Sequence, residues 1–146
     1  MNSEPHLSLI ARTIQLSVAP VFLLTAIGTT IAILIGRLNR IVDRARILEG
    51  FIPSASTEKE AEIHAELSTL SRRAKLINLA VTLGTVCAVL ICLMIAMMFN
   101  GVFFSIDLAD LVAALFVSAM FFFIGALLVF LREIFIAVKN LRIGMK

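Results

Sequence analysis

The sequence predicts an all-α integral membrane protein with three long transmembrane helices, on the strength of its composition and the clustering of its apolar residues. Hydrophobic residues make up 60% of the 146-residue chain and charged residues 16%, and the mean hydropathy is +1.04. Soluble domains are about half apolar and about a quarter charged. The apolar residues form three long runs, and a bilayer core about 30 Å thick needs roughly 20 such residues per helix.

The first run predicts span one over residues 7–36, with an amphipathic approach before about Val18. Pro20 lies where a helix either begins or kinks. No basic stretch precedes the run, so we expect it to be retained rather than removed as a signal peptide.

Spans two and three are expected over residues 76–99 and 108–131. The stretch between them is short and contains Asn100-Gly101 as the expected helix breaker, so the two spans form an antiparallel hairpin. Residues 132–146 are expected to continue span three as a helical tail.

The distribution of Lys and Arg predicts the orientation, because cytoplasmic segments are enriched in them. Residues 37–75 contain eight of these basic residues and the tail contains four, whereas Arg12 is alone on the opposite side. The N-terminus is therefore expected outside and the C-terminus inside.

Residues 37–75 predict an antiparallel helical hairpin in the cytoplasm. Its first arm has an apolar face formed by Leu38, Ile41, Val42, Ala45 and Leu48, and Gly50 and Pro53 are expected to end it. Thr57 with Glu60 is a capping box that starts the second arm. An apolar face at spacings of three and four then runs into span two, through Ile63, Leu67, Leu70, Ala74 and Ile77.

Polar side chains form a stripe along each of the first two spans. They are Arg12, Gln15, Thr25 and Thr29 in span one, and Asn78, Thr82 and Thr85 in span two. Small residues spaced by four accompany them, in Gly28-Ala32-Gly36 and Ala80-Gly84-Ala88. Such stripes indicate packing within the chain or between subunits, or alternatively a hydrated pathway at an oligomer axis.

Asp107 and Asp110 stand at the start of span three. They fit helix capping, because carboxylates bind free backbone N–H groups there, and alternatively an acidic cation site at a pore mouth. Arg12 is expected to reach the lipid interface or to pair with one of these two acids.

Arg37, Arg40 and Arg44 follow span one on the side of its polar stripe. The first interpretation is that they set the topology of the protein. The second is that they bind anionic lipids at the inner leaflet. Phe51 and Ile52 lie at the tip of the hairpin, where they either fold back or dock a partner.

The sequence contains no pattern typical of an enzyme. His6 and His64 are isolated, the two cysteines lack metal-ligand spacing, and no glycine-rich phosphate loop or nucleophile elbow occurs. We therefore expect no catalytic residue, no metal and no cofactor. Without a basic domain bearing aromatic side chains, nucleic acid is not an expected partner.

Four blocks resemble the domain-of-unknown-function 2721 family: SLIARTIQLSVAPVFLLTAIGT, LNRIVDRAR, RRAKLINLA and FLREIFIAVKNLRIG. The resemblance covers nearly the whole chain. It implies a small bacterial protein with three spans, and hence a multi-pass protein of the bacterial inner membrane. It implies no particular activity and no functional residues.

Two functions fit these features. The first is a homo-oligomeric pore or ion channel lined by the polar stripe of span one or span two. The alternative is a non-conducting accessory or scaffold protein that organises a larger membrane complex through its cytoplasmic hairpin. The expected partners are the lipid bilayer with its anionic lipids, other copies of the chain, and a membrane protein.

Overall fold

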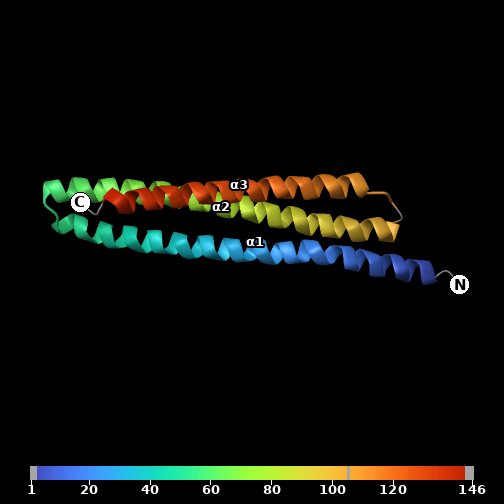
Figure 1. Cartoon of the computed structure of the whole chain (residues 1–146). Helices are drawn as coiled ribbons and strands as arrows, with labels where there is room; N and C mark the ends of the chain where they lie inside the picture. Colours follow the sequence, from blue (N-terminus) through green and yellow to red (C-terminus); the bar gives the residue numbers. More distant parts are fainter. Residues whose placement is uncertain (1–2, 105, 144–146) are drawn as a thin grey trace. The chain divides into compact units, whose positions relative to one another are not determined.

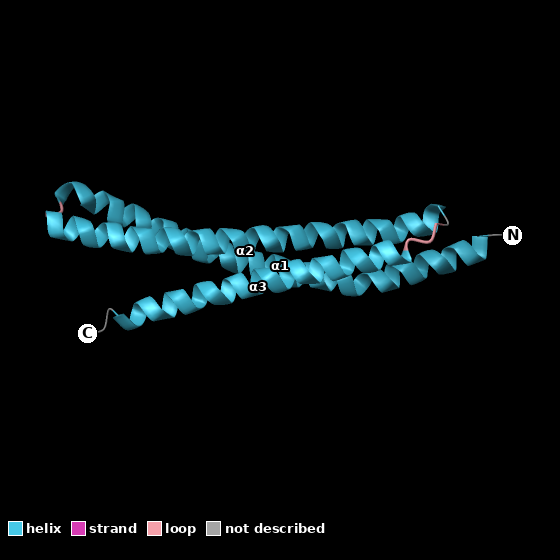
Figure 2. Ribbon diagram, turned by 90° about the horizontal axis from the view of Figure 1, so that it is seen from above, coloured by secondary structure: helices cyan, strands magenta, loops and turns pink. Residues whose placement is uncertain are grey.

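The computed structural model describes residues 3–104 and 106–143, which are almost entirely helical. Helix α1 spans Ser3–Phe51, the short 3-10 helix η1 spans Ile52–Ser54, α2 spans Thr57–Phe104 and α3 spans Ala109–Ile143 (Figure 1). Figure 2 shows helices and loops and no strand in this part of the chain. Each of the three long helices is long and apolar enough to cross a membrane, which confirms the three-span prediction.

The chain divides into two compact units, each built from parts of all three long helices. The first unit consists of Met1–Thr30 and Leu83–Ile124, and the second of Ile31–Thr82 and Gly125–Lys146.

Buried side chains recur every seven residues along each helix. They include Ile27, Leu34, Ile41 and Leu48 in α1, Leu70, Ile77 and Ile91 in α2, and Ala119, Ala126 and Glu133 in α3. A repeat of seven keeps one stripe of a helix facing its neighbours when helices pack at a small angle. The positions of this repeat are called the seam below.

The second unit has an apolar core between α1 and α2. Leu34, Ile41 and Leu48 pack with Leu70, Ile77 and Ala80, and Val129 and Phe130 of α3 lie against this cluster. The predicted hairpin arms therefore pack on each other with the expected residues, except for Val42. Val42 is 36% exposed, because it lies about 100° around the helix from the seam position Ile41.

The ends of the hairpin arms differ from the prediction by one or a few residues. Gly50 lies within α1, and Pro53 lies in η1. The Glu60 N–H donates to the Ser56 carbonyl at 2.9 Å, so Ser56 rather than Thr57 occupies the cap position of α2.

The predicted helix breaker Asn100-Gly101 lies inside α2, which continues to Phe104. Pro20 lies within α1 and so does not begin that helix. Asn100 stays helical with its side-chain amide donating to the Ala96 carbonyl at 2.9 Å. A Cβ at Gly101 would lie 3.2 Å from the Ile106 carbonyl, so this glycine instead allows the chain to turn back closely after α2.

Candidate functional site

A carboxylate occupies a seam position of α3. Glu133 follows Ala126 by seven residues and is fully buried in the second unit. A charged side chain is rarely buried unless it is paired, because its ionised form loses water on burial. The surroundings of Glu133 therefore define a candidate site.

Two arginines from the other two helices hold this carboxylate. Arg37 Nη1 of α1 donates to Glu133 Oε2 at 3.0 Å. Arg73 of α2 donates to Glu133 Oε1 from Nε at 3.1 Å and from Nη2 at 2.8 Å. The guanidinium of Arg37 also lies 5.2 Å from the centre of the Phe130 ring, within the range of a cation–π contact. Glu133, Arg37 and Arg73 are called the Glu133 ion cluster below. They join all three helices of the second unit.

A hollow of about 240 Å³ lies beside the Glu133 ion cluster. It is lined by Arg37, Arg40, Ile41, Arg44, Leu70 and Arg73, so the three arginines of the sequence prediction share one hollow. Arg37 is paired with Glu133, and Arg44 donates to Glu66 at 3.0 Å. Arg40 has no ion pair in the part of the chain that the structure describes. Anionic lipid binding by these three residues stays a prediction.

The predicted polar stripes lie outside the intramolecular core. Their members Arg12, Gln15, Thr25, Thr29, Asn78, Thr82 and Thr85 are all exposed. The hydroxyls of Thr25, Thr29 and Thr82 donate to the carbonyl four residues earlier in their own helix. Such a hydroxyl has its hydrogen bond within the helix and can face lipid without water.

The two small-residue motifs have different surroundings. Ala80 and Gly84 are buried within the chain, as an intramolecular packing motif requires. Gly28 and Gly36 are exposed, and a Cβ built at either residue would meet nothing within 4 Å.

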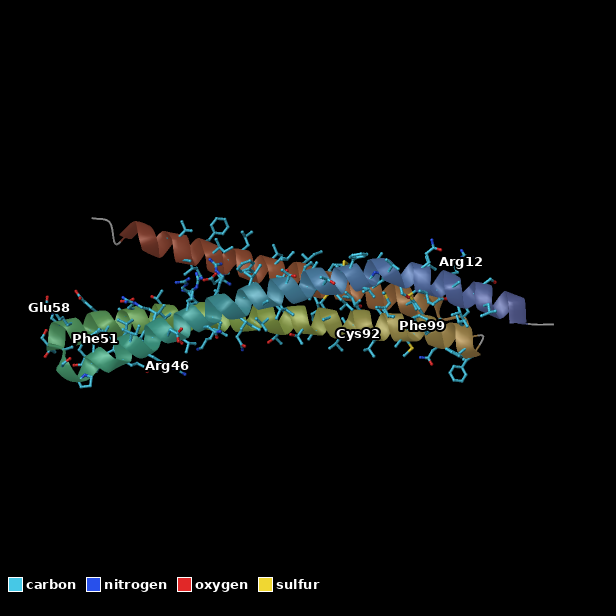
Figure 3. The ribbon with its side chains drawn as sticks, turned by 90° about the horizontal axis from the view of Figure 1, so that it is seen from below. Arg12, Arg46, Phe51, Glu58, Cys92 and Phe99 are labelled. Carbon is cyan, nitrogen blue, oxygen red and sulfur yellow. The ribbon has the colours of Figure 1, made fainter. Side chains whose placement is uncertain are left out.

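Asp107 and Asp110 lie at the start of α3, as the sequence predicts. The Asp107 Oδ1 accepts from the N–H of Ala109, the first residue of α3, at 3.0 Å, so this carboxylate binds a free backbone N–H at the helix start. The cap position itself is Leu108, whose carbonyl accepts from the Val112 N–H at 2.9 Å. Asp110 is exposed in the first turn of α3. Arg12 is exposed and projects from α1 (Figure 3), and among the described residues it forms no ion pair with either aspartate.

Phe51 and Ile52 lie at the connection between α1 and α2, where Figure 3 labels Phe51 near Glu58. Phe51 is 58% exposed and Ile52 is half-buried. The tip of the hairpin therefore presents one aromatic ring to its surroundings.

Glu133 and Arg73 were not among the sequence-predicted site residues. The spacing of seven from Ala119 and Ala126 to Glu133 was present in the sequence, and it places a charge on a face that otherwise carries apolar and small residues. The pairing of Arg73 with Glu133 depends on how α2 packs against α3. No local sequence pattern predicts that packing.

Three apolar helices and an ion cluster centred on a buried carboxylate define a multi-pass membrane protein whose helices are joined by charge as well as by apolar packing. A family model described as "Protein of unknown function (DUF2721)" matches residues 17–143. The chain belongs to this family, as its sequence blocks suggested. Neither a curated protein nor a solved structure matches the chain.

Proposed function

We propose that this protein is a non-conducting accessory protein, which assembles with copies of itself and presents the α1–α2 hairpin to a larger membrane complex. The observation that carries the proposal is the length of the helices. Helices α1 and α2 contain 49 and 48 residues, more than twice the roughly 20 that a bilayer crossing needs. The additional residues pack on each other through their own apolar core, which a pore-lining helix does not require.

The hairpin is suited to docking because it is stiffened by this core and ends in the exposed ring of Phe51. With the N-terminus outside and the C-terminus inside, as the Lys and Arg distribution predicts, the hairpin extends into the cytoplasm from the bacterial inner membrane. An exposed aromatic ring at the centre of a contact is a common source of binding energy.

Replacing Phe51 by serine is expected to abolish capture of the partner complex. A photo-crosslinker at position 51 of the full chain in native membranes should yield one stoichiometric adduct, and affinity purification of the Phe51→Ser variant should lose the same protein. Phe103 is 76% exposed at the far end of α2 and provides the matched control, because Phe103→Ser removes another exposed ring, one that lies outside the hairpin. Equal recovery of the partner with Phe51→Ser would contradict docking through the tip.

Self-assembly is supported by the open surface at Gly28 and Gly36. Glycine and alanine spaced by four let membrane helices approach closely, and within the described residues a Cβ at Gly28 or Gly36 would meet no neighbouring atom within 4 Å. A second copy of α1 is the proposed neighbour.

Gly28→Leu is expected to convert the oligomer to monomer without harming the fold of the single chain. Gly28 is exposed and a Cβ added there meets nothing within 4 Å, and leucine favours a helix over glycine by up to about 1 kcal/mol. Crosslinking in native membranes across a range of expression levels measures the change. Gly50→Leu is the control, because Gly50 has the same free space but lies at the hairpin end of α1. Monomer alone in the wild type would contradict self-assembly.

The second candidate function is a homo-oligomeric pore, favoured by the exposure of Gln15, Thr25 and Thr29 on α1. Val18 and Phe22 lie between them on the same face, at spacings of three and four, and Phe22 is 72% exposed. These two apolar side chains interrupt a continuous polar lining. Conductance of the purified protein in planar bilayers, altered by Thr29→Leu, would favour the pore over the accessory function.

A further inference from the structure

We propose that the α2–α3 face of the second unit binds an anionic phospholipid, with the headgroup phosphate in a basic hollow and an acyl chain in the adjoining apolar groove. This site is separate from the hollow beside Glu133 and does not depend on the proposed docking function.

The basic hollow has a volume of about 540 Å³. Its lining consists of Ser68, Thr69 and Arg72 from α2 and Arg132, Ile136 and Lys139 from α3. Three cations thus surround one space, and none of the residues named as its lining is acidic. Within residues 3–104 and 106–143, no carboxylate pairs with Arg72, Arg132 or Lys139.

This absence of counter-charge distinguishes the basic hollow from the one beside Glu133. There, three of the four arginines are paired with a carboxylate, Arg37 and Arg73 with Glu133 and Arg44 with Glu66. Three uncompensated cations close together repel one another, and an anion relieves that repulsion. Phosphate oxygens match guanidinium and ammonium donors, and the exposed Ser68 hydroxyl is a further donor at the same hollow.

An apolar groove of about 320 Å³ adjoins this hollow. Leu128, Leu131 and Phe135 line it together with Arg132, Ile136 and Lys139, the last three of which also line the basic hollow. The side chains of Leu128, Leu131 and Phe135 are exposed. A space that is cationic at one end and apolar at the other fits an amphiphile, whereas a free phosphate ion would leave the apolar end unused.

The depth of the site fits a lipid headgroup. Arg132 directly follows Leu131, where the apolar run of α3 ends, so the cations lie where hydrocarbon gives way to headgroups. This placement holds for either orientation of the chain. In the predicted orientation it is the inner leaflet, whose anionic lipids attract clustered Lys and Arg.

The test measures lipid binding to the purified full-length protein in a neutral detergent by native mass spectrometry. Phosphatidylglycerol and phosphatidylcholine with identical acyl chains are added separately, and radiolabelled inorganic phosphate is added in a third arm. The wild type is expected to retain phosphatidylglycerol in preference to phosphatidylcholine. Combining Arg72→Gln, Arg132→Gln and Lys139→Gln should reduce retention of phosphatidylglycerol at least about tenfold.

The matched control combines Arg12→Gln, Arg46→Gln and Lys59→Gln, which removes the same charge from exposed residues elsewhere. This control should retain phosphatidylglycerol as the wild type does, and helix content by circular dichroism should be the same in all three proteins. Equal loss in the control, or no loss in the Arg72, Arg132 and Lys139 variant, would overturn the site.

A further variant distinguishes the lipid from free phosphate. Phe135→Ser removes an exposed ring of the apolar groove and should weaken phosphatidylglycerol retention while the cations stay in place. Saturable binding of inorganic phosphate that displaces the lipid and is unaffected by Phe135→Ser would assign the hollow to phosphate and overturn the lipid proposal.

Discussion

Replacing Glu133 by glutamine is expected to lower the free energy of unfolding by about 3 kcal/mol, the largest effect we expect from a single polar substitution in this chain. Glutamine keeps the size of the side chain but removes its charge. Arg37 and Arg73 are held at 3.0 and 2.8 Å from the carboxylate and would then face each other without a counter-charge. Removing the buried partner of an ion pair costs more than the pair itself contributes when the remaining charges have little water, and the side chains of Arg37 and Arg73 are only 35% and 22% exposed.

The measurement is a denaturant titration of the purified protein in detergent micelles, followed by circular dichroism. Glu66→Gln is the matched control, because Glu66 also accepts a 3.0 Å hydrogen bond from an arginine but both partners are exposed. That substitution should cost less than about 1 kcal/mol. Equal effects of the two substitutions would contradict a special contribution from the buried cluster.

The architecture could be predicted from sequence because its determinants are local. A run of apolar residues of sufficient length defines a span without any knowledge of its neighbours. In the hairpin arms, Ile41 and Leu48 could be assigned to the core because the other faces of the helix carry charged residues. Hydrophobicity therefore marks the packed side of a helix where its remaining sides are polar.

Inside the membrane this signal is lost, because lipid tails are as apolar as a protein core. The polar stripe with Thr25 and Thr29 was predicted to serve packing within the chain or between subunits, or a water pathway, and both residues are exposed on the single chain. Buried Ile27 and exposed Ile33 are the same residue type, so composition cannot separate them. Their spacing does distinguish them, because Ile27 belongs to the repeat of seven that continues through Leu34 and Ile41.

To predict the Glu133 ion cluster, one would need to know how the three helices are rotated relative to one another. The position of Glu133 on the seam could be found from spacing, and Arg37 was recognised, but as a residue that sets topology. The pairing itself depends on the rotation of α1 and α2 around α3. No pattern within a single helix encodes that rotation, so the cluster appears only in the three-dimensional structure.

Replacing Ile41 by alanine is expected to destabilise the protein by about 3 kcal/mol, because it leaves a cavity in the core of the second unit. Ile41 is buried among Leu34, Leu48 and Leu70 of the apolar cluster. It lies beyond the apolar run of span one, so we expect unfolding to expose it to water and the full cost of transfer to apply.

The substitution Val42→Ala at the neighbouring residue is the control, because it tests whether the cost depends on the seam position. Both residues are β-branched and both gain helix propensity on becoming alanine, so their local effects are similar. Val42 is 36% exposed, and its truncation should cost less than about 1 kcal/mol in the same denaturant titration. If the two costs were equal, the arms of the hairpin would not pack through the repeat of seven, and the wider apolar face predicted from the sequence, with Val42 included, would be the correct one.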